Sequence, residues 1–350
     1  MAVAAHQADG IVSTPLLSDH PRYTQVAELG GGAHGKVLLA LDRLTGQHVA
    51  LKFVCRGPDH IDKYVEREIV NQLKLRHPHI IALQEVFLTD THLVLAMEYA
   101  AGGNLFHYVK SRKGLSEHDA RWFFQQLIIA LAYCHSMGVS NRDIKLENTL
   151  LTGGACPTIK LADFGFSKDH DMHSAPTSRV GTPAYLAPEV INSRPGQAYD
   201  SQKADVWSCG VLLYTMCCNT YPFHRPQDAL LPLHEALQAQ FRRILLADYQ
   251  FPPHKQLSEE LRDLISRILV LDTNKRLSLQ DIVGHPWFAK NLHPDALRFN
   301  ESMVKESLAN LPAPQMLEEV CVCVKCVWGV GGWGVGVQLL PACLLVLVWA

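Results

Sequence analysis

Residues 141–148 read NRDIKLEN, and a DFG tripeptide begins downstream at Asp163. Phosphoryl transfer needs a carboxylate that orients the attacking hydroxyl, positive charge on the moving phosphoryl group and oxygen ligands for Mg²⁺. Asp143 fits the first role and Lys145 the second. Asn148 and Asp163 fit the third. A polar loop before a strand turn is the structural alternative, but the D-x-K-x-x-N pattern followed by D-F-G at this separation favours the chemical reading.

A glycine-rich stretch, GGGAHGKV, occupies residues 30–37 upstream of this pattern. Read as G-x-x-x-x-G-K, it nearly matches a P-loop. However, Val37 replaces the hydroxyl residue that would hold Mg²⁺, and the text after it predicts a strand where a P-loop needs a helix. Read as G-x-G-x-x-G-x-V between two strands, it is a lid whose backbone N–H groups can approach phosphates. A plain glycine-rich hairpin turn is also open, because the motif alone is weak.

Lys52 ends a VALK tetrapeptide inside an apolar predicted strand, where an unpaired ammonium is costly to bury. Glu68, on the predicted helix that follows, is a reasonable partner. An ion pair there would hold the lysine towards the α- and β-phosphates of a nucleotide. A lysine that snorkels from a strand end is the alternative.

The predicted secondary structure divides the chain into a β-rich part and a helical part. The sequence pattern changes from strand-like to helical after an Ala-Ala-Gly-Gly run that marks a hinge. The expected strands cover residues 36–41, 48–54, 80–88 and 92–98, and the expected helices cover residues 61–76, 116–136, 203–218, 232–245, 258–270 and 278–283. We therefore predict an α+β, bilobal fold with a small β-rich N-lobe and a larger helical C-lobe. The expected segments are a flexible extension (1–21), the N-lobe (22–99), the C-lobe (100–289), a regulatory segment (290–320) and an apolar low-complexity tail (321–350).

Composition narrows the function classes. The 350 residues carry a net charge of −2, which offers no general attraction for nucleic acid, so we expect no nucleic-acid partner. Hydrophobic residues make up 48% of the chain, ample for a buried core. The N-terminus lacks the basic start and apolar run of a secretory signal, and the cysteines show no disulfide framework. We expect a reduced protein in the cytoplasm, the nucleus or both.

In this order, these segments resemble the eukaryotic protein kinase family over about residues 23–288. Glu189 ends an A-P-E tripeptide that closes the activation segment in that family, and Arg276 stands where the family's arginine pairs with that glutamate. Asp205 matches the buried helix aspartate beneath the family's catalytic loop. The resemblance implies a bilobal, ATP-dependent protein kinase that uses ATP and Mg²⁺ as cofactors.

The resemblance also implies roles for single residues. The catalytic residues that it implies are Asp143, Lys145, Lys52 and Glu68, and the metal ligands are Asn148 and Asp163. The residues expected to bind the nucleotide are Gly30, Gly31, Gly32, Gly35, Val37, Ala50, Lys52, Met97, Glu98 and Ala100.

Lys145 and a GTPAY run resemble serine/threonine kinases rather than tyrosine kinases. Shorter sequence motifs resemble the plant sucrose-non-fermenting-1-related kinases of the second subfamily, which osmotic stress activates. The phrases that carry this likeness are RG at 56–57, ID at 61–62, REI at 67–69, KLENTL at 145–150, DFGFSK at 163–168 and the run at 180–188. The resemblance implies a phosphoprotein of stress signalling, although related stress and energy kinases share several of these phrases.

Arg142 precedes the expected base, so the family reading implies control by phosphorylation of the activation loop, either by an upstream kinase or by the chain itself. Ser178 is the best-placed acceptor and Thr177 the next. Arg142 and Lys168 would receive the phosphate group. Solvated loop hydroxyls without this role are the alternative.

Thr182 and Glu147 are expected to contact a protein substrate that offers a Ser or Thr hydroxyl. Glu147 matches the position that meets a basic residue upstream of the target in kinases of this kind. Asn104 stands where the family usually has a glutamate, which weakens the expected preference for Arg or Lys before the target.

Three positions depart from the family inside the catalytic machinery. Asn141 replaces the usual histidine or tyrosine that packs against the Phe of D-F-G, and Gln72 stands in the same internal stack. His34 replaces the aromatic tip of the glycine lid. A half-satisfied buried amide destabilises its surroundings, so we expect reduced basal activity.

The composition of the sequence changes abruptly near the C-terminus. A QMLEEV run at residues 315–320 resembles the start of the subfamily's regulatory helix, whereas residues 327–350 carry no charge. The length of this apolar stretch would permit a membrane anchor. Its glycines disfavour a helix, however, so we expect no membrane insertion. The acidic stretch that hormone-responsive members use to dock a protein phosphatase is absent, so the resemblance gives no support for that partner.

Two other function classes stay open. A pseudokinase scaffold would bind partners without transferring phosphate, but its usual sign is the loss of an ATP-site or metal-site residue, and those residues are present. A small-molecule kinase would share the lobe design, but it would not need the run at residues 181–189, with which protein kinases seat a peptide. We therefore predict a serine/threonine protein kinase, with a weakly active or pseudokinase scaffold as the alternative.

Overall fold

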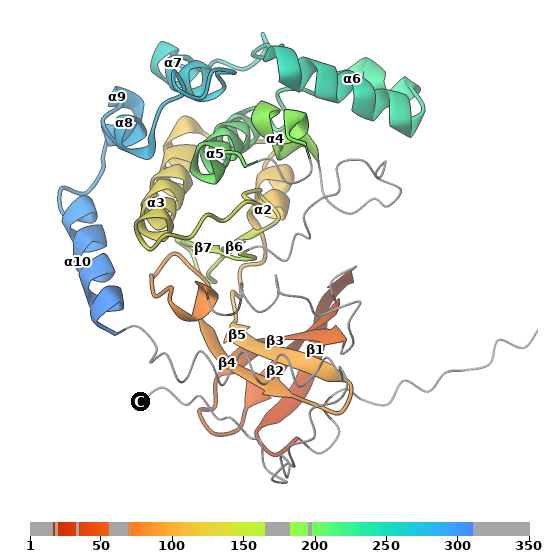
Figure 1. The fold of residues 1–350 in the computed structure, drawn as a ribbon, viewed down its shortest axis with the longest axis vertical. Coiled ribbons are helices and arrows are strands. Elements are labelled where there is room, and N and C mark those ends of the chain that lie inside the picture. The colour runs from red at the N-terminus through yellow and green to blue at the C-terminus, as the bar shows by residue number, and fades with distance from the viewer. Residues whose placement is uncertain are drawn as a thin grey trace, which may run out of the picture.

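The computed structural model describes residues 17, 20–32, 35–55, 69, 71–164, 183–194 and 198–310. A small part built around a β-sheet is followed along the chain by a larger, mainly helical part. Figure 1 shows the sheet below the helices, with a short pair of strands between them. The predicted α+β, bilobal architecture is confirmed.

The sheet contains β1 (Tyr23–Gly32), β2 (Gly35–Asp42), β3 (His48–Cys55), β4 (Leu83–Leu88) and β5 (His92–Glu98). Its strands are antiparallel in the order β1-β2-β3-β5-β4. The register places Val37 opposite Lys52 and Ala50 opposite Met97, and directly paired residues project from the same face of a sheet. A lysine therefore lies beside apolar side chains on the sheet face that a nucleotide would need.

The helical part contains α2 (Leu105–Ser111), α3 (Glu117–Ser136), β6 (Thr149–Leu151), β7 (Ile159–Leu161), α4 (Pro188–Asn192), α5 (Ser201–Cys218), α6 (Leu233–Leu246), α7 (Glu259–Ile268), α8 (Leu279–Val283), α9 (Pro286–Ala289) and α10 (Ala296–Ala309). Short 3-10 turns lie at Pro183–Tyr185 and Pro226–Leu230. The helices α3, α5, α6, α7 and α8 begin and end within two residues of the predicted bounds. Two bounds were wrong: the helix expected to reach residue 76 is helical only to Leu73, and the strand expected from residue 80 begins at Leu83.

Capping residues set the ends of the two central helices. The Ser116 hydroxyl accepts a hydrogen bond from the backbone N–H of Asp119 at the start of α3. The carboxylate of Asp200 accepts from two backbone N–H groups at the start of α5. Asn219, with a φ of 58°, ends α5 in the left-handed conformation that asparagine tolerates. Both helices are buried along most of their length, so they form the core of the helical part.

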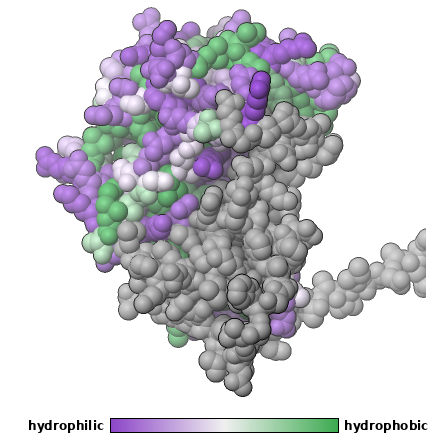
Figure 2. All heavy atoms as spheres, in the orientation of Figure 1, coloured by the Kyte–Doolittle hydropathy of each residue, from purple (hydrophilic) through white to green (hydrophobic). Residues whose placement is uncertain are grey.

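The surface around this core is largely polar. Figure 2 shows hydrophilic side chains over most of the described face of the helical part, with apolar side chains in smaller groups. Within the described residues, no helix is both long enough and apolar enough to cross a membrane. The predicted tail at residues 321–350 lies outside the described residues, as does most of the N-terminal extension.

Backbone pairing fixes the segment that joins the two parts. The Gly102 N–H donates to the carbonyl of Leu151 at 2.8 Å, and the Leu151 N–H donates back to the carbonyl of Gly103 at 2.8 Å. A Cβ atom at position 102 would lie 2.3 Å from the carbonyl oxygen of Thr152, so only glycine permits this approach. The predicted hinge is therefore docked directly on β6.

Helix α10 was not predicted from the sequence, and it packs along α3 (Figure 1). The Asn300 amide donates to the carbonyl of Ile129 at 3.1 Å, and the Ser307 hydroxyl lies 2.7 Å from the hydroxyl of Tyr133. The same Tyr133 oxygen accepts from the backbone N–H of Arg76 at 2.8 Å. Part of the expected regulatory segment is therefore an element of the fold, tied to the catalytic part by buried polar contacts.

His77 gives this junction a pH dependence. Its ring stacks on Tyr133 and contacts Phe299 of α10, and burial, assisted by repulsion from His79, lowers the pKa of His77 from 6.5 to about 3. Between those two pH values the unfolded chain binds a proton that the folded chain does not, so stability falls as the pH falls through this window. From pH 7.5 to pH 5.5 we expect His77 to cost the protein about 1 kcal/mol of unfolding free energy, which a His77→Gln variant would not lose.

Urea denaturation of both proteins at the two pH values measures this difference. His118→Gln, at an exposed position on α3, controls for the removal of any one imidazole. Equal pH dependence in the wild type and the His77→Gln variant would contradict the prediction.

Candidate active site

Asp143 lies in the loop between α3 and β6 with its carboxylate held by two side chains. The Lys145 ammonium and the Asn148 amide nitrogen each donate to Asp143 Oδ2 at 2.6 Å. The same amide nitrogen lies 3.1 Å from the Asp143 carbonyl oxygen. Because the nitrogen of Asn148 is turned towards Asp143, the amide oxygen is the atom that Asn148 can offer to a cation.

Lys52 and Asp163 join the sheet to the helical part. Lys52 Nζ in β3 lies 2.7 Å from Asp163 Oδ1 in the loop after β7. Asp163 has a φ of 55°, a left-handed backbone that Asp and Asn adopt more readily than other side chains do. The sequence suggested Glu68 as the partner of Lys52, and Glu68 lies outside the described residues. Among the residues that the structure describes, Asp163 supplies a carboxylate to Lys52.

Asn141 connects the two halves of the site. Its amide oxygen accepts from the backbone N–H of Asp143 at 3.2 Å, and its amide nitrogen lies 3.4 Å from the carbonyl oxygen of Asp163. We expected a half-satisfied buried amide at this position, and that expectation is wrong because each end of the amide has a partner. A side-chain amide carries a donor and an acceptor side by side, so it can span two backbone segments. Gln72 is also buried, and His34 lies outside the described residues.

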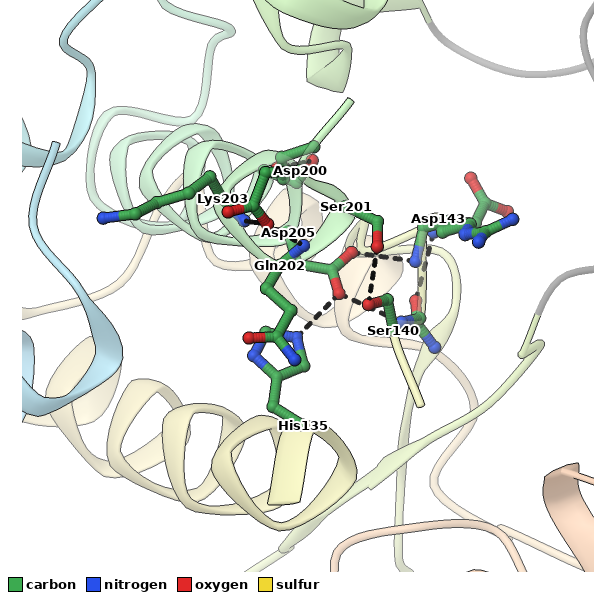
Figure 3. Close-up of polar contacts among 12 residues, drawn as sticks. His135, Ser140, Asp143, Asp200, Ser201, Gln202, Lys203 and Asp205 are labelled. Atoms are coloured by element: carbon green, nitrogen blue, oxygen red, sulfur yellow. Dashed lines mark hydrogen bonds and ion pairs between the residues drawn. The ribbon is translucent and has the colours of Figure 1, made fainter. Parts of the chain in front are cut away.

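A buried carboxylate from α5 supports this loop from below. Asp205 accepts from the backbone N–H of Asn141 at 3.0 Å and from that of Arg142 at 2.8 Å (Figure 3). His135, at the end of α3, places its Nε2 2.9 Å from the same carboxylate. Arg142 has a φ of 64°, so the loop is held in an unfavourable conformation by contacts that Asp205 supplies. The predicted place of Asp205 beneath the catalytic loop is confirmed.

Arg276 and Glu189 form the predicted ion pair. The two terminal nitrogens of the buried guanidinium lie 2.6 and 2.9 Å from the two Glu189 oxygens. The same guanidinium donates to the carbonyl oxygens of Lys203 and Val270 and lies over the ring of Trp207. Two parallel charge-assisted bonds fix the geometry of a pair as well as adding strength, so the end of the A-P-E segment is anchored to the core.

The glycine-rich stretch contains the end of β1 and the start of β2, which pair with each other. Strand β2 begins at Gly35, so the stretch does not open a helix and the P-loop reading is excluded. Gly35 has a φ of 113°, and a Cβ there would lie 1.8 Å from the carbonyl oxygen of Phe53. Gly30 and Gly31 pair with Val37 and Lys36 across the hairpin, which leads directly to the sheet face that carries Lys52.

The sheet face beside Lys52 fits a nucleotide. Val37, Ala50 and Met97 are only partly buried, whereas Leu38, Leu51 and Ala96 on the opposite face of these strands are fully buried. They form an apolar surface next to a paired lysine, and the backbone of Glu98 and Ala100 continues from it into the segment that joins the lobes. Apolar walls, a lysine and two oxygen-bearing side chains are the donor set that ATP and Mg²⁺ require.

Glu147 has an unusual environment for a carboxylate. Its Oε1 accepts from the Tyr221 hydroxyl at a long 3.4 Å, whereas its Oε2 is buried and has no hydrogen-bond partner among the described residues. Burial raises the pKa of Glu147, and the Lys145 charge only partly offsets that effect. A buried oxygen without a partner is costly, so this position favours a bound cationic group.

Several predicted site residues cannot be placed in this arrangement. Glu68, Lys168, Thr177, Ser178 and Thr182 lie outside the described residues. Two residues that sequence reasoning did not single out lie close to the site: His135 beneath Asp205, and Lys160 in β7, whose Nζ lies 2.5 Å from Glu98 Oε1. Lys160 could have been singled out from the sequence, because it is a charged residue inside the apolar, strand-like segment that precedes D-F-G.

Comparison with known proteins gives the same picture. Residues 23–288 match the family model described as the protein kinase domain. The chain is 45% identical over 306 residues to serine/threonine-protein kinase SRK2A of Physcomitrium patens, covering 87% of this chain and 85% of that protein. It is 44% identical over 311 residues to serine/threonine-protein kinase SRK2E of Arabidopsis thaliana, covering 89% and 83%. It is 47% identical over 283 residues to serine/threonine-protein kinase SAPK9 of Oryza sativa subsp. japonica, covering 81% and 76%.

Proposed function

The chain belongs to the protein kinase family, and from that premise we propose a role for each residue of the site. It is an ATP-dependent protein serine/threonine kinase and resembles the SRK2 and SAPK kinases over most of its length. Family membership implies the use of ATP and Mg²⁺, and when bound they supply the γ-phosphoryl group and neutralise its charge. The remaining work falls to the chain's own side chains.

Asp143 orients the substrate hydroxyl and accepts its proton as the oxygen attacks. Lys145 and Asn148 hold that carboxylate in place through its Oδ2, which leaves Oδ1 for the substrate. Lys145 also brings positive charge to the transferred group. Asn148, through its amide oxygen, and Asp163 would hold the cation, and Lys52 would meet the α- and β-phosphates from the sheet face.

One observation supports this proposal most strongly: residues from three separate segments meet at one site, with Lys52 on Asp163, Asn148 on Asp143, and Asn141 between the two aspartates. The pseudokinase alternative is not favoured, because Lys52, Asp143, Asn148 and Asp163 are present and contact one another in pairs. The direct test is phosphate transfer from Mg-ATP to matched peptides whose acceptor is serine, threonine or tyrosine. Transfer to serine and threonine is expected, and transfer to tyrosine alone would contradict the assignment.

Glu147 gives the substrate a charge preference. Its buried Oε2, which has no hydrogen-bond partner in the described part of the chain, supports a subsite for Arg or Lys upstream of the target residue. Asn104, the position where the family usually has glutamate, uses its side-chain oxygen to cap α2 by accepting from the backbone of His107 at 3.0 Å. The basic preference therefore depends on Glu147.

Glu147→Gln removes the negative charge while keeping the side-chain shape. We expect kcat/KM for a serine peptide with an upstream arginine to fall about 10- to 100-fold, because hydrogen bonds to charged groups contribute about 1.5–3 kcal/mol. The matched peptide with alanine in place of that arginine should lose little. If both peptides lose activity equally, Glu147 supports the fold of the loop and does not read the substrate.

Activation-loop phosphorylation is the proposed control. Ser178, with Thr177 as the second acceptor, would carry the phosphate group after the action of an upstream kinase or of the chain itself. Arg142 and Lys168 would receive it, since a phosphate adds about −1.5 to −2 charge and three acceptors. The exposure of Arg142 supports this role, because its side chain is accessible to a phosphate group while Asp205 holds its backbone.

The likeness to the SRK2 and SAPK kinases supports a role in stress signalling, with other proteins as substrates. Action in the cytoplasm, the nucleus or both is part of the same proposal. We place the N-lobe at residues 22–99, the C-lobe at 100–289 and a regulatory segment at 290–320, within which helix α10 (Ala296–Ala309) lies.

A further inference from the structure

Lys160 and Glu98 form an ion pair where the two lobes meet. Lys160 lies in β7, shortly before Asp163, and Glu98 ends β5, where the chain enters the segment between the lobes. The two charged groups are 2.5 Å apart, and their side chains are 13% and 30% exposed. The pair is therefore largely shielded from the water and salt that weaken exposed pairs.

Backbone hydrogen bonds make a second connection between the same two strands. The Ile81 N–H donates to the carbonyl of Leu161 at 2.9 Å, and the Leu161 N–H donates to the carbonyl of His79 at 2.8 Å. Glu98 donates its N–H to the carbonyl of Ala82 at 2.9 Å, and its second carboxylate oxygen lies 3.3 Å from the Ala82 N–H. The loop before β4 therefore contacts both β5 and β7. The Lys160–Glu98 ion pair joins β7 to β5 directly, so the three segments are all connected to one another.

The charge of Lys160 acts on this loop as well. Burial lowers the pKa of His79, and the nearby Lys160 ammonium lowers it further. Among the groups that face Lys160, His77 and His79 offer no negative charge, so within the described residues the carboxylate of Glu98 is the group that balances the ammonium. Loss of Glu98 would leave a largely buried positive charge beside two imidazoles.

We infer that the Lys160–Glu98 ion pair positions the metal-binding end of the nucleotide site relative to its base-binding end. The inference rests on the proposed function, in which Asp163 holds the cation and the backbone after Met97 holds the base. β7 leads into Asp163 and β5 leads into the base-binding segment, so the pair sets the spacing of the two ends. Lys160 is a positioning residue and touches neither nucleotide nor substrate.

This role predicts a specific pattern of affinities. Mg-ATP spans both ends of the site and needs the correct spacing, whereas adenosine occupies the base-binding end alone. In Lys160→Met and in Glu98→Gln we expect the Kd for Mg-ATP to rise about tenfold and the Kd for adenosine to rise less than about threefold. The charge-reversed double variant, Lys160→Glu with Glu98→Lys, should recover most of the Mg-ATP affinity.

Displacement of a fluorescent ATP analogue measures both affinities without any turnover. Lys275→Met is the matched control, because this lysine is 79% exposed and pairs with Asp272 at 3.8 Å, in an ion pair that does not join the two lobes. Equal losses of Mg-ATP and adenosine affinity, or no recovery in the double variant, would overturn the inference. Wild-type protein that fails to bind Mg-ATP would reject the nucleotide site itself, and wild-type binding with an unaltered Lys160→Met variant would reject this inference alone.

Discussion

Asp163→Asn is expected to lower kcat about a thousandfold or more while leaving the fold intact. The asparagine keeps the shape of the side chain and tolerates the left-handed backbone at this position, where φ is 55°. It removes the negative charge that would hold the cation and that now lies 2.7 Å from the Lys52 ammonium. The phosphoryl group would then meet an incomplete set of charges, and Lys52 would lose the ion pair with Asp163.

The kcat of purified protein with Mg-ATP and a basic serine peptide measures the effect. Asp163→Ala should be as inactive as the asparagine variant, with an added loss of stability because alanine is poorly suited to a positive φ. Asp295→Asn is the matched control, since this carboxylate is 63% exposed at the start of α10. Activity within tenfold of the wild type in Asp163→Asn would mean that the cation is held elsewhere, and the proposed roles would need to be reassigned.

Local signals explain which parts of the fold were predictable. The helices α3 and α5 carry their own capping residues and long apolar text, so their bounds followed from the sequence alone. Helix α10 carries neither signal: no side chain caps its start, and its buried residues are the polar Asn300 and Ser307. These two side chains are buried because α3 offers them partners, which is a property of the tertiary structure.

The candidate site divides in the same way. Residues whose roles depend on short spacing, such as Asp143 and Asn148, were found because the distance along the chain sets their geometry. The pairing of Lys52 with Asp163 and that of Lys160 with Glu98 join residues far apart in the sequence. Neither follows from composition or periodicity, because many carboxylates could have served as partners. For Asn141 the sequence identified the residue but not its contacts, because its two hydrogen bonds depend on how the backbone of two segments is placed.

Asp205→Asn is expected to impair both stability and catalysis, because one buried carboxylate organises the whole catalytic loop. It accepts from the backbone of Asn141 and Arg142 and contacts His135 from α3. An asparagine offers one acceptor oxygen and one N–H₂ group, so at least one N–H donor of the loop would face another donor. Each buried donor left without a partner costs about 1–3 kcal/mol, and the loss of a buried charge adds to that cost. We expect the free energy of unfolding to fall by about 3 kcal/mol.

The catalytic effect follows from the backbone of Arg142. Its φ of 64° is unfavourable and persists because Asp205 holds its N–H at 2.8 Å, so loss of that bond lets the loop relax and moves the neighbouring Asp143. A displacement of about 1 Å in a catalytic group costs about a hundredfold in rate, which is the fall in kcat that we expect. Urea denaturation and peptide phosphorylation measure the two effects. Ser201→Ala, which removes a hydroxyl pair with Ser140 close to the same carboxylate (Figure 3), should change both by little. If Asp205→Asn unfolds more easily but the folded fraction keeps wild-type kcat, the carboxylate supports the lobe without positioning Asp143.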